Sequence, residues 1–175
     1  MPLYEIYHST PLTTIQKSHL AQSITSLHST TFRTPSLFVN IRFVASEPAG
    51  DYFVAGKPTQ PTSPNRIVAM VRTGGPGRSK ETFDEVARKI EGIWEDVVVN
   101  TDGGEKGRKL HFIVFTTILA AVENGVVIPG AGEEGTWLKS NMAYFREQAE
   151  VGRDEHFRDM LQEIEEREDL KGLVL

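Results

Sequence analysis

The chain repeats one order of predicted secondary structure, in which a helix joins two strands. Strands are predicted where apolar and polar side chains alternate or β-branched residues gather, and helices where apolar side chains recur every three or four residues. The pattern occupies residues 3–7, 14–30 and 37–44, and then residues 67–71, 79–93 and 110–116. A connection of this length favours parallel pairing of the two strands that it joins. We therefore expect two β-α-β units in tandem, at about residues 2–46 and 66–117.

The two predicted helices resemble each other in their apolar positions. An offset of 66 residues places apolar on apolar side chains at four positions, Leu20 on Val86, Ala21 on Ala87, Ile24 on Ile90 and Leu27 on Ile93. The first helix also begins with a capping box of Thr13 and Gln16. We interpret the two units as a duplication. A loop rich in Pro, Gly, Ser and Thr, at about residues 47–65, separates them.

Length and composition limit the class of protein. The 175 residues, 39% hydrophobic and 25% charged, are typical of one globular domain. No apolar run approaches the ~20 residues of a membrane span, and the first residues lack a signal-peptide pattern, so we expect a soluble, cytoplasmic protein without a membrane partner. A net charge of -5 argues against a nucleic acid partner. Without cysteine, any chemistry has to come from His, carboxylates, Arg, Tyr or the terminal amine.

A proline follows the initiator methionine, at the start of the first predicted strand. If Met1 is removed, the nitrogen of Pro2 is a free secondary amine on a rigid ring and can give or take a proton. Burial and nearby positive charge both lower the pKa of such an amine from its reference of about 8. Pro2 is therefore a candidate acid or base, although a proline is also tolerated at the first residue of a strand for structural reasons alone.

Further motifs extend from Pro2 to Trp137. They are Met1-Pro2-Leu3-Tyr4 with Tyr7 and Ser9, then Ala21, Ile24, Thr25 and His28, then Pro48-Ala49-Gly50 with Phe53 and Gly56, then Arg72 and Gly77-Arg78-Ser79, and finally Glu123 and Gly125 with Pro129, Gly132, Glu134-Gly135 and Trp137. Together they resemble the tautomerase superfamily, and within it the cis-3-chloroacrylic acid dehalogenase group, whose members fuse two copies of the short tautomerase unit.

The resemblance implies an α+β fold, in which the tandem β-α-β units form a four-stranded mixed sheet with both helices on one face. It assigns residues 1–137 to a tautomerase-like domain and leaves residues 138–175 as a C-terminal helical extension. An amphipathic helix is predicted there from the spacing of Phe157, Met160, Leu161 and Ile164. Because the open face of such a sheet is apolar and has to be buried, the resemblance also implies a homotrimer in which three sheets enclose a core.

The resemblance implies a role for each candidate site residue. Pro2 would be the general acid or base, and His28 would donate to the substrate's carboxylate or carbonyl. Arg72 and Arg78 would hold the carboxylate of a small substrate, a task that suits the planar fork of a guanidinium, and would lower the pKa of Pro2. Glu123 would orient or deprotonate water. No cofactor or metal is expected, because the other histidines lack the spacing of a ligand set.

Two departures from the dehalogenase pattern bear on the reaction. The tyrosine that those enzymes carry before the glutamate is absent, because residues 113–115 are Ile, Val and Phe. The two arginines are six residues apart, whereas the loop between them is tighter in those enzymes. Keto-enol tautomerisation needs only a suitable base, a carboxylate anchor and a sheltered pocket. We therefore expect an enzyme, a tautomerase of small 2-oxo or unsaturated acids. The alternatives are a hydratase or dehalogenase of 3-haloacrylate-type acids, and a non-enzymatic oligomeric binding protein of the same fold.

Overall fold

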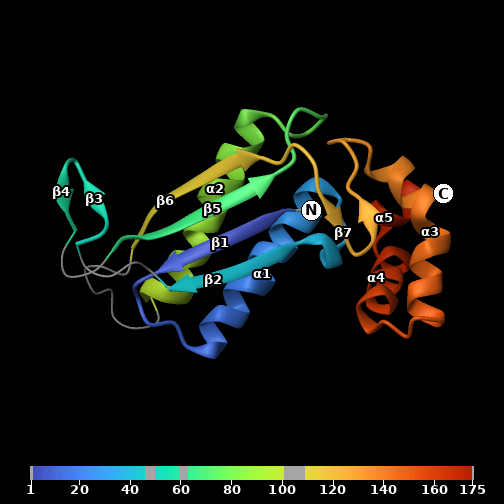
Figure 1. Ribbon diagram of the computed structural model, residues 1–175, viewed down its shortest axis with the longest axis horizontal. Helices are drawn as coiled ribbons and strands as arrows, with labels where there is room; N and C mark the ends of the chain where they lie inside the picture. Colours follow the sequence, from blue (N-terminus) through green and yellow to red (C-terminus); the bar gives the residue numbers. More distant parts are fainter. Residues whose placement is uncertain (1, 46–49, 60–62, 101–108, 175) are drawn as a thin grey trace.

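A four-stranded sheet forms the centre of the computed structural model, which describes residues 2–45, 50–59, 63–100 and 109–174 (Figure 1). Its strands, in sheet order, are β2 (Asn40–Ala45), β1 (Leu3–His8), β5 (Asn65–Val71) and β6 (Leu110–Thr117). Pairing is parallel within each unit, β1 with β2 and β5 with β6, and antiparallel between the units, β1 with β5. The predicted α+β fold, with a mixed sheet of tandem β-α-β units, is confirmed.

Two helices, α1 (Thr14–Phe32) and α2 (Lys80–Trp94), cover one face of this sheet (Figure 1). Their buried side chains meet those of the strands in one core, which includes Tyr4, Leu20, Ile24, Phe32, Ile67, Phe83, Val86, Ile90 and Trp94. Three of the four apolar matches between the helices are buried in this core or in contact with it, and the alanine pair is the exception. The last turn of α2 continues as the π-helical segment η2 (Glu95–Val99).

Both helices begin at the residues that the sequence predicted. Thr13 caps α1, its side chain accepting from Gln16 N over 3.1 Å while Gln16 Oε1 accepts from Thr13 N over 3.0 Å, so the predicted capping box is confirmed. Ser79 caps α2 by accepting from Thr82 N. α1 ends at Arg33, whose φ of 50° places it in the left-handed region.

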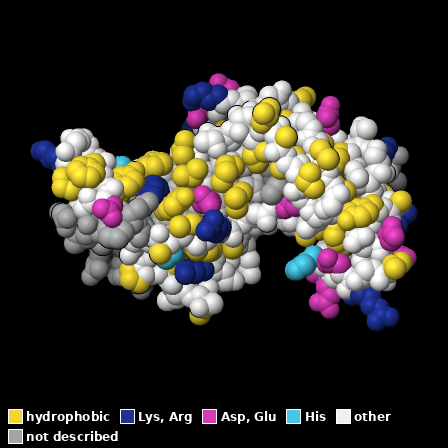
Figure 2. Space-filling model, viewed as in Figure 1, with side chains coloured by type: hydrophobic (Ala, Val, Ile, Leu, Met, Phe, Trp, Pro, Cys, Tyr) yellow, Lys and Arg dark blue, Asp and Glu magenta, His cyan; other side chains and the backbone are white. Residues whose placement is uncertain are grey.

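The opposite face of the sheet carries apolar side chains that are only partly covered. Because side chains alternate along a strand, Leu3, Val68 and Met70 lie on this face, opposite the buried Tyr4 and its neighbours. Among the larger apolar residues here, Val114 is 39% exposed. Figure 2 shows hydrophobic side chains across the sheet, with charged side chains among them. No helix of the described ranges covers this face.

A hairpin interrupts the segment that the sequence predicted as a loop. Strands β3 (Phe53–Val54) and β4 (Lys57–Pro58) pair antiparallel and project from the body at the left of Figure 1. Their two turn residues, Ala55 and Gly56, have φ values of 52° and 74°, which is the geometry of a tight two-residue turn. The prediction of a loop through this segment missed the hairpin, because the two strands are too short to produce a pattern. Pro48 and Ala49 of the quoted motif lie outside the described residues.

The C-terminal part forms a second core of its own. A hairpin of β7 (Val122–Glu123) and β8 (Val126–Val127) leads into α3 (Glu134–Glu150), α4 (Glu155–Glu166) and α5 (Glu168–Val174). Their buried side chains are Val126, Leu138, Phe145, Ala149, Phe157, Met160, Ile164 and Leu170, joined by Phe38 from the short helix η1 (Ser36–Phe38). The predicted C-terminal helical region is confirmed, and the predicted amphipathic helix is α4.

Polar contacts fasten this extension to the end of α1. Glu163 accepts from the backbone N–H and the hydroxyl of Ser36, over 2.8 and 2.9 Å. Arg167 donates to the hydroxyl of Ser29 and pairs with Glu163. Helix α3 runs across the predicted boundary at residue 137, and the division into two domains stays a prediction. Within the described ranges, no helix is both long and apolar enough to cross a membrane.

Candidate active site

The sheet topology brings the ends of both units to one edge. β1 runs antiparallel to β5, so Leu3 at its start pairs with Met70 near the end of β5. β2 starts at the same edge, where Asn40 pairs with Leu3. In each unit the helix runs back along the sheet, so α1 ends and α2 begins at this edge (Figure 1). Pro2, the last turns of α1 and the turn before α2 are therefore neighbours.

Arg72 and Arg78 flank the Gly-rich turn between β5 and α2. Both are buried, and both donate to the same oxygen, Oε1 of Glu134, over 3.0 Å from Arg72 Nη2 and 2.7 Å from Arg78 Nη2. Arg72 Nη1 also donates to the carbonyl oxygens of Pro129 and Gly130. Burial lowers the pKa of Arg72, and the Glu134 carboxylate opposes that shift. The structure thus brings the two predicted arginines together on a carboxylate of the chain itself.

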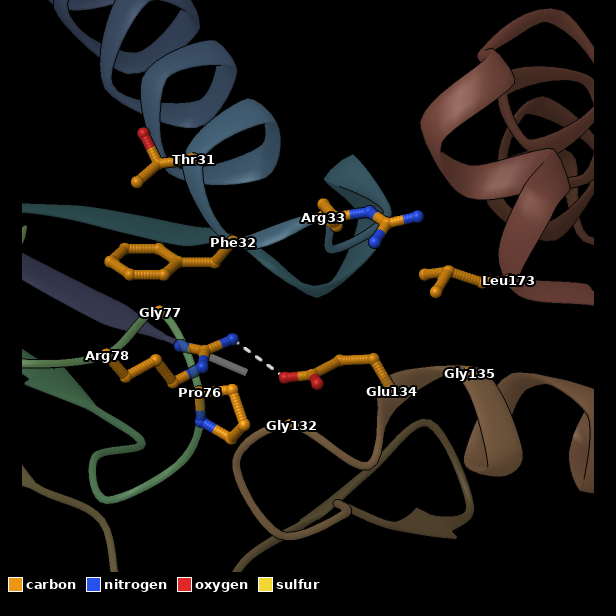
Figure 3. A pocket seen from close by; sticks show the side chains of 10 residues that line it. All are labelled: Thr31, Phe32, Arg33, Pro76, Gly77, Arg78, Gly132, Glu134, Gly135 and Leu173. Atoms are coloured by element: carbon orange, nitrogen blue, oxygen red, sulfur yellow. Dashed lines mark hydrogen bonds and ion pairs between the residues drawn. The ribbon is translucent and has the colours of Figure 1, made fainter.

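Two loops approach each other closely to make these ion pairs (Figure 3). A Cβ added at Gly75 would overlap the carbonyl oxygen of Ala131, and one added at Gly132 would come within 2.7 Å of Pro76 Cδ. Gly132 also has a φ of 89°, a conformation that glycine adopts without strain. The absence of side chains at Gly75 and Gly132 therefore allows the turn with the arginines to meet the loop before α3.

His28 lies on the buried side of α1, one turn before its end. The ring is 1% exposed, and its Nδ1 lies 2.8 Å from the hydroxyl of Tyr4 on β1. The pKa of His28 is lowered well below its usual value by burial first, and then by the positive charges of Arg78, the N-terminus and Arg72. Burial also raises the pKa of the Tyr4 hydroxyl.

The tautomer of His28 sets the direction of its hydrogen bond with Tyr4, since the hydroxyl can donate to Nδ1 or accept from it. When the hydroxyl donates, the ring proton is on Nε2. This nitrogen is buried and has no hydrogen-bond partner among the described residues. In that tautomer, His28 offers a neutral N–H donor that nothing in the described part of the chain uses.

Pro2 and Glu123 are linked through Asn40. Pro2 is buried, and its carbonyl oxygen accepts from the backbone N–H of Asn40 over 3.1 Å. The side chain of Asn40 donates to Glu123 Oε1 over 2.6 Å. Oε2 of Glu123 is buried without a partner among the described residues. Burial raises the pKa of Glu123, while the bond from Asn40, the N-terminal charge and Arg72 oppose the shift.

Electrostatic effects connect groups that do not touch. The charge of Arg72 favours the ionised form of Glu123 and the neutral form of His28, and Glu123 in turn favours the charged form of Arg72. Arg78 acts in the same way on His28 and, against burial, on Tyr4. The residues singled out from the sequence therefore share one electrostatic environment at this edge, and the arginines are its main source of positive charge.

A cavity of about 240 Å³ lies beside the ion pair of Arg78 and Glu134. It is lined by Thr31, Phe32, Arg33, Pro76, Gly77, Arg78, Gly132, Glu134, Gly135 and Leu173. Figure 3 shows that these residues come from the end of α1, the Gly-rich turn, the start of α3 and the end of α5. Arg78 also lies over the ring of Phe32, 4.5 Å from its centroid. The cavity thus lies between the end of α1 with the Gly-rich turn on one side and the C-terminal helices on the other, and both charged and apolar side chains line it.

Three residues of the site had no assigned role in the sequence. Glu134 and Tyr4 belong to the quoted motifs, but nothing in the spacing indicates that Glu134 bridges the arginines or that Tyr4 bonds to His28. Asn40 is the first residue of β2, and nothing in the sequence indicates that its side chain bonds to a site residue. The one available signal for Glu134 in the sequence is its place in the quoted motif, between Gly132 and Gly135.

A comparison with known protein families identifies the family of this chain. Residues 1–142 match the family model described as "Putative oxalocrotonate tautomerase enzyme". The chain therefore belongs to this family, and so to the tautomerase superfamily. No curated protein sequence matches the chain.

Solved structures show the same fold. One is N1, a member of the cis-3-chloroacrylic acid dehalogenase family, with 22% identity, a TM-score of 0.60 and coverage of 78% of this chain and 90% of that one. A second, "a probable enzyme from the thermophilic fungus Aspergillus fumigatus", has 26% identity, a TM-score of 0.53 and coverage of 81% and 94%. A third, a fused 4-OT described as an asymmetric trimer, has 17% identity, a TM-score of 0.53 and coverage of 71% and 94%. The predicted resemblance to the tautomerase superfamily is confirmed, and a member of the dehalogenase family and a fused 4-OT have a fold similar to that of this chain.

Proposed function

We propose that the protein is a tautomerase that moves a proton within small 2-oxo acids and their enols, with the amine of Pro2 as the proton carrier. The observation that carries the proposal is the position of Pro2, buried at the edge of the sheet where Glu123 is held through Asn40. In this reaction the neutral amine accepts the proton of the enol hydroxyl. The resulting ammonium returns a proton to the carbon next to the new carbonyl group, so no proton is gained or lost overall.

The other residues would hold and polarise the substrate. Arg78 borders the cavity and Arg72 adds its charge, so an anionic carboxylate is favoured there. The N–H at Nε2 of His28 supports a donor role toward the substrate carboxylate or carbonyl, because it is buried, neutral and unpaired within the described ranges. The positive charges nearby also lower the pKa of the Pro2 amine, which increases its neutral fraction near pH 7.

Hydration of an unsaturated acid is the second candidate, and Oε2 of Glu123 favours it. This oxygen is buried and unpaired in the described part of the chain, and burial raises the pKa of its carboxyl group. A water bound there would be oriented by a base, while protonated Pro2 delivered a proton to carbon. The two reactions need opposite protonation states of Pro2. Activity that rises with pH indicates tautomerisation, and activity that falls with pH indicates hydration.

Assembly into a homotrimer is part of the proposal. The sheet face with Leu3, Val68, Met70 and Val114 is apolar and incompletely covered within one chain, and a second copy of the same face is a suitable partner. One structure of similar fold is described as a trimer. Sedimentation is expected to give about three times the 19.5 kDa mass of one chain. A monomeric mass would contradict this part of the proposal.

Chemical labelling tests the role of Pro2 directly. The chain without Met1 is treated with 3-bromopyruvate, an electrophilic 2-oxo acid, and the adduct is mapped by mass spectrometry. We expect one adduct, on the nitrogen of Pro2, and loss of phenylenolpyruvate ketonisation in proportion to labelling. Pro2→Ala is expected to lower the ketonisation rate by at least about 100-fold. Absence of both labelling and ketonisation would leave the non-enzymatic binding protein as the better account.

A further inference from the structure

Glu134 is a buried acid with two cationic partners on one oxygen. It is 9% exposed, and Arg72 and Arg78 both donate to its Oε1. A buried ion triad of this kind is seldom retained for stability, because well-packed apolar side chains in its place are often as stable or more so. Arg78 and Glu134 line a cavity, and Arg72 contacts the same carboxylate oxygen, so the charges of all three affect what can bind there. This location suggests a function in ligand binding.

The contacts around Glu134 restrict both guanidinium groups. Arg78 donates to Glu134 through Nη2 and to the carbonyl oxygen of Arg72 through Nη1, while its plane lies over Phe32. Arg72 donates to Glu134 and to two backbone carbonyl oxygens. Neither side chain can turn without losing several of these contacts. The carboxylate is the one group that both arginines share, so it determines their separation.

Glu134 also determines the charge of the site. Without it, two guanidinium groups would be buried side by side with their charges opposed by nothing in direct contact. With it, one net positive charge remains among these three side chains. Arg33 lines the same cavity, but it is exposed to solvent and donates to the carbonyl oxygen of Asp169, so water screens its charge. One net buried charge matches one substrate carboxylate.

We propose that Glu134 is a positioning residue of this site, which holds Arg72 and Arg78 on one shared oxygen and cancels one of their charges, so that the site accepts a monocarboxylate and discriminates against a dicarboxylate. The inference rests on the proposed function, in which the arginines anchor the substrate carboxylate. A second carboxylate on the ligand would find no unpaired positive charge, because the first carboxylate already neutralises the one net positive charge of the three side chains. Its desolvation would then be uncompensated.

Equilibrium binding of two unreactive acids tests this role without turnover. Butyrate and succinate have the same number of carbon atoms and differ by one carboxylate. Calorimetry on the unmodified protein is expected to show tighter binding of butyrate. In Glu134→Gln, which keeps the shape and removes the charge, the ratio of succinate to butyrate affinity is expected to rise at least about tenfold. Glu147→Gln, at an exposed acid of the same helix, makes the same change in net charge and is expected to leave the ratio unchanged.

Glu134→Asp provides the second variant and covers the case in which Glu134→Gln does not fold. It keeps the charge but shortens the side chain by one methylene group, so the preference for butyrate is expected to remain while both affinities fall several-fold. An unchanged ratio in Glu134→Gln, an equal change in Glu147→Gln, wild-type affinities in Glu134→Asp, or no binding of either acid would each overturn the proposal. Failure of the proposed function has a separate signature, the absence of a Pro2 adduct and of ketonisation.

Discussion

The two β-α-β units have the same architecture but use their helices differently. In α2 the buried side chains are Phe83, Val86, Ile90 and Trp94, all hydrophobic. In α1 the buried side chains include Leu20 and Ile24 at the matching positions, but also Gln16, His28, Ser29 and Phe32. The second unit places its polar site residues outside the helix, in the turn that holds Arg72 and Arg78.

This difference shows how two units of the same architecture can divide stability and chemistry between them. The antiparallel pairing of β1 with β5 places the end of α1 and the start of α2 at the same edge of the sheet. The first unit can therefore contribute side chains from inside its helix, and the second can contribute them from the preceding turn. The apolar side chains of both helices meet in the shared core.

The largest expected effect tests the part of the two helices that is alike. Ile24→Ala and Ile90→Ala remove the same side chain at matching, fully buried positions. Each is expected to lower the free energy of unfolding by about 2–5 kcal/mol, because the surrounding core relaxes only partly into the cavity. Urea unfolding followed by circular dichroism measures both. If Ile24→Ala lowered the free energy of unfolding far less than Ile90→Ala does, α1 would contribute much less to the core than α2.

A glycine substitution tests the turn that carries the arginines. Gly75→Ala introduces a Cβ that overlaps the backbone of Ala131, so it is expected to cost about 1–3 kcal/mol and to separate the arginines from Glu134. Gly92→Ala, in α2 of the same unit, meets nothing within 4 Å and is expected to stabilise by up to about 1 kcal/mol. Thermal unfolding and butyrate binding measure the two effects. If Gly75→Ala left binding unchanged, close contact of the two loops would not be needed for the site.

The pH dependence of stability tests the polar face of α1. The folded-state pKa of His28 lies well below the value of 6.5 expected for the unfolded chain, so below that pH the unfolded state binds a proton that the native state does not. This stability contribution is present above about pH 6.5 and is lost as the pH falls, by at most about 1.4 kcal/mol per pH unit for one proton. Urea unfolding between about pH 5 and 8 measures the slope. His28→Gln is expected to flatten it, and an equal slope in this variant would mean that His28 is not the group responsible.

The sequence was sufficient to predict the two β-α-β units, because their signals are local, whereas the mixed sheet that joins them was predicted from the family resemblance. The capping box at Thr13, the spacing from Leu20 to Leu27 and its recurrence from Val86 to Ile93 each report one element. Two such units fix a small number of topologies. The short hairpin from Phe53 to Pro58 escaped prediction because its strands contain only two residues each.

The contacts of the site could be predicted only in part. The family resemblance indicated Pro2, His28, Arg72, Arg78 and Glu123, and the structure places them at one edge. The partners come from distant segments, Glu134 for the arginines and Asn40 for Glu123, and no periodicity relates positions so far apart. The arginines to which the resemblance assigns the substrate carboxylate already bind a carboxylate of the chain itself. This contact forms only when the two loops pack together, so the sequence alone does not reveal it.

The chemistry proposed for the first unit depends on the amine of Pro2, the residue with which that unit begins. Phenylenolpyruvate ketonisation can be measured for two otherwise identical chains, one starting at Pro2 and one retaining Met1. Because an amide nitrogen has no basic lone pair, we expect only the chain that starts at Pro2 to be active, with a rate that rises with pH as the amine loses its proton. Equal rates for the two chains would contradict the central claim that Pro2 carries the proton.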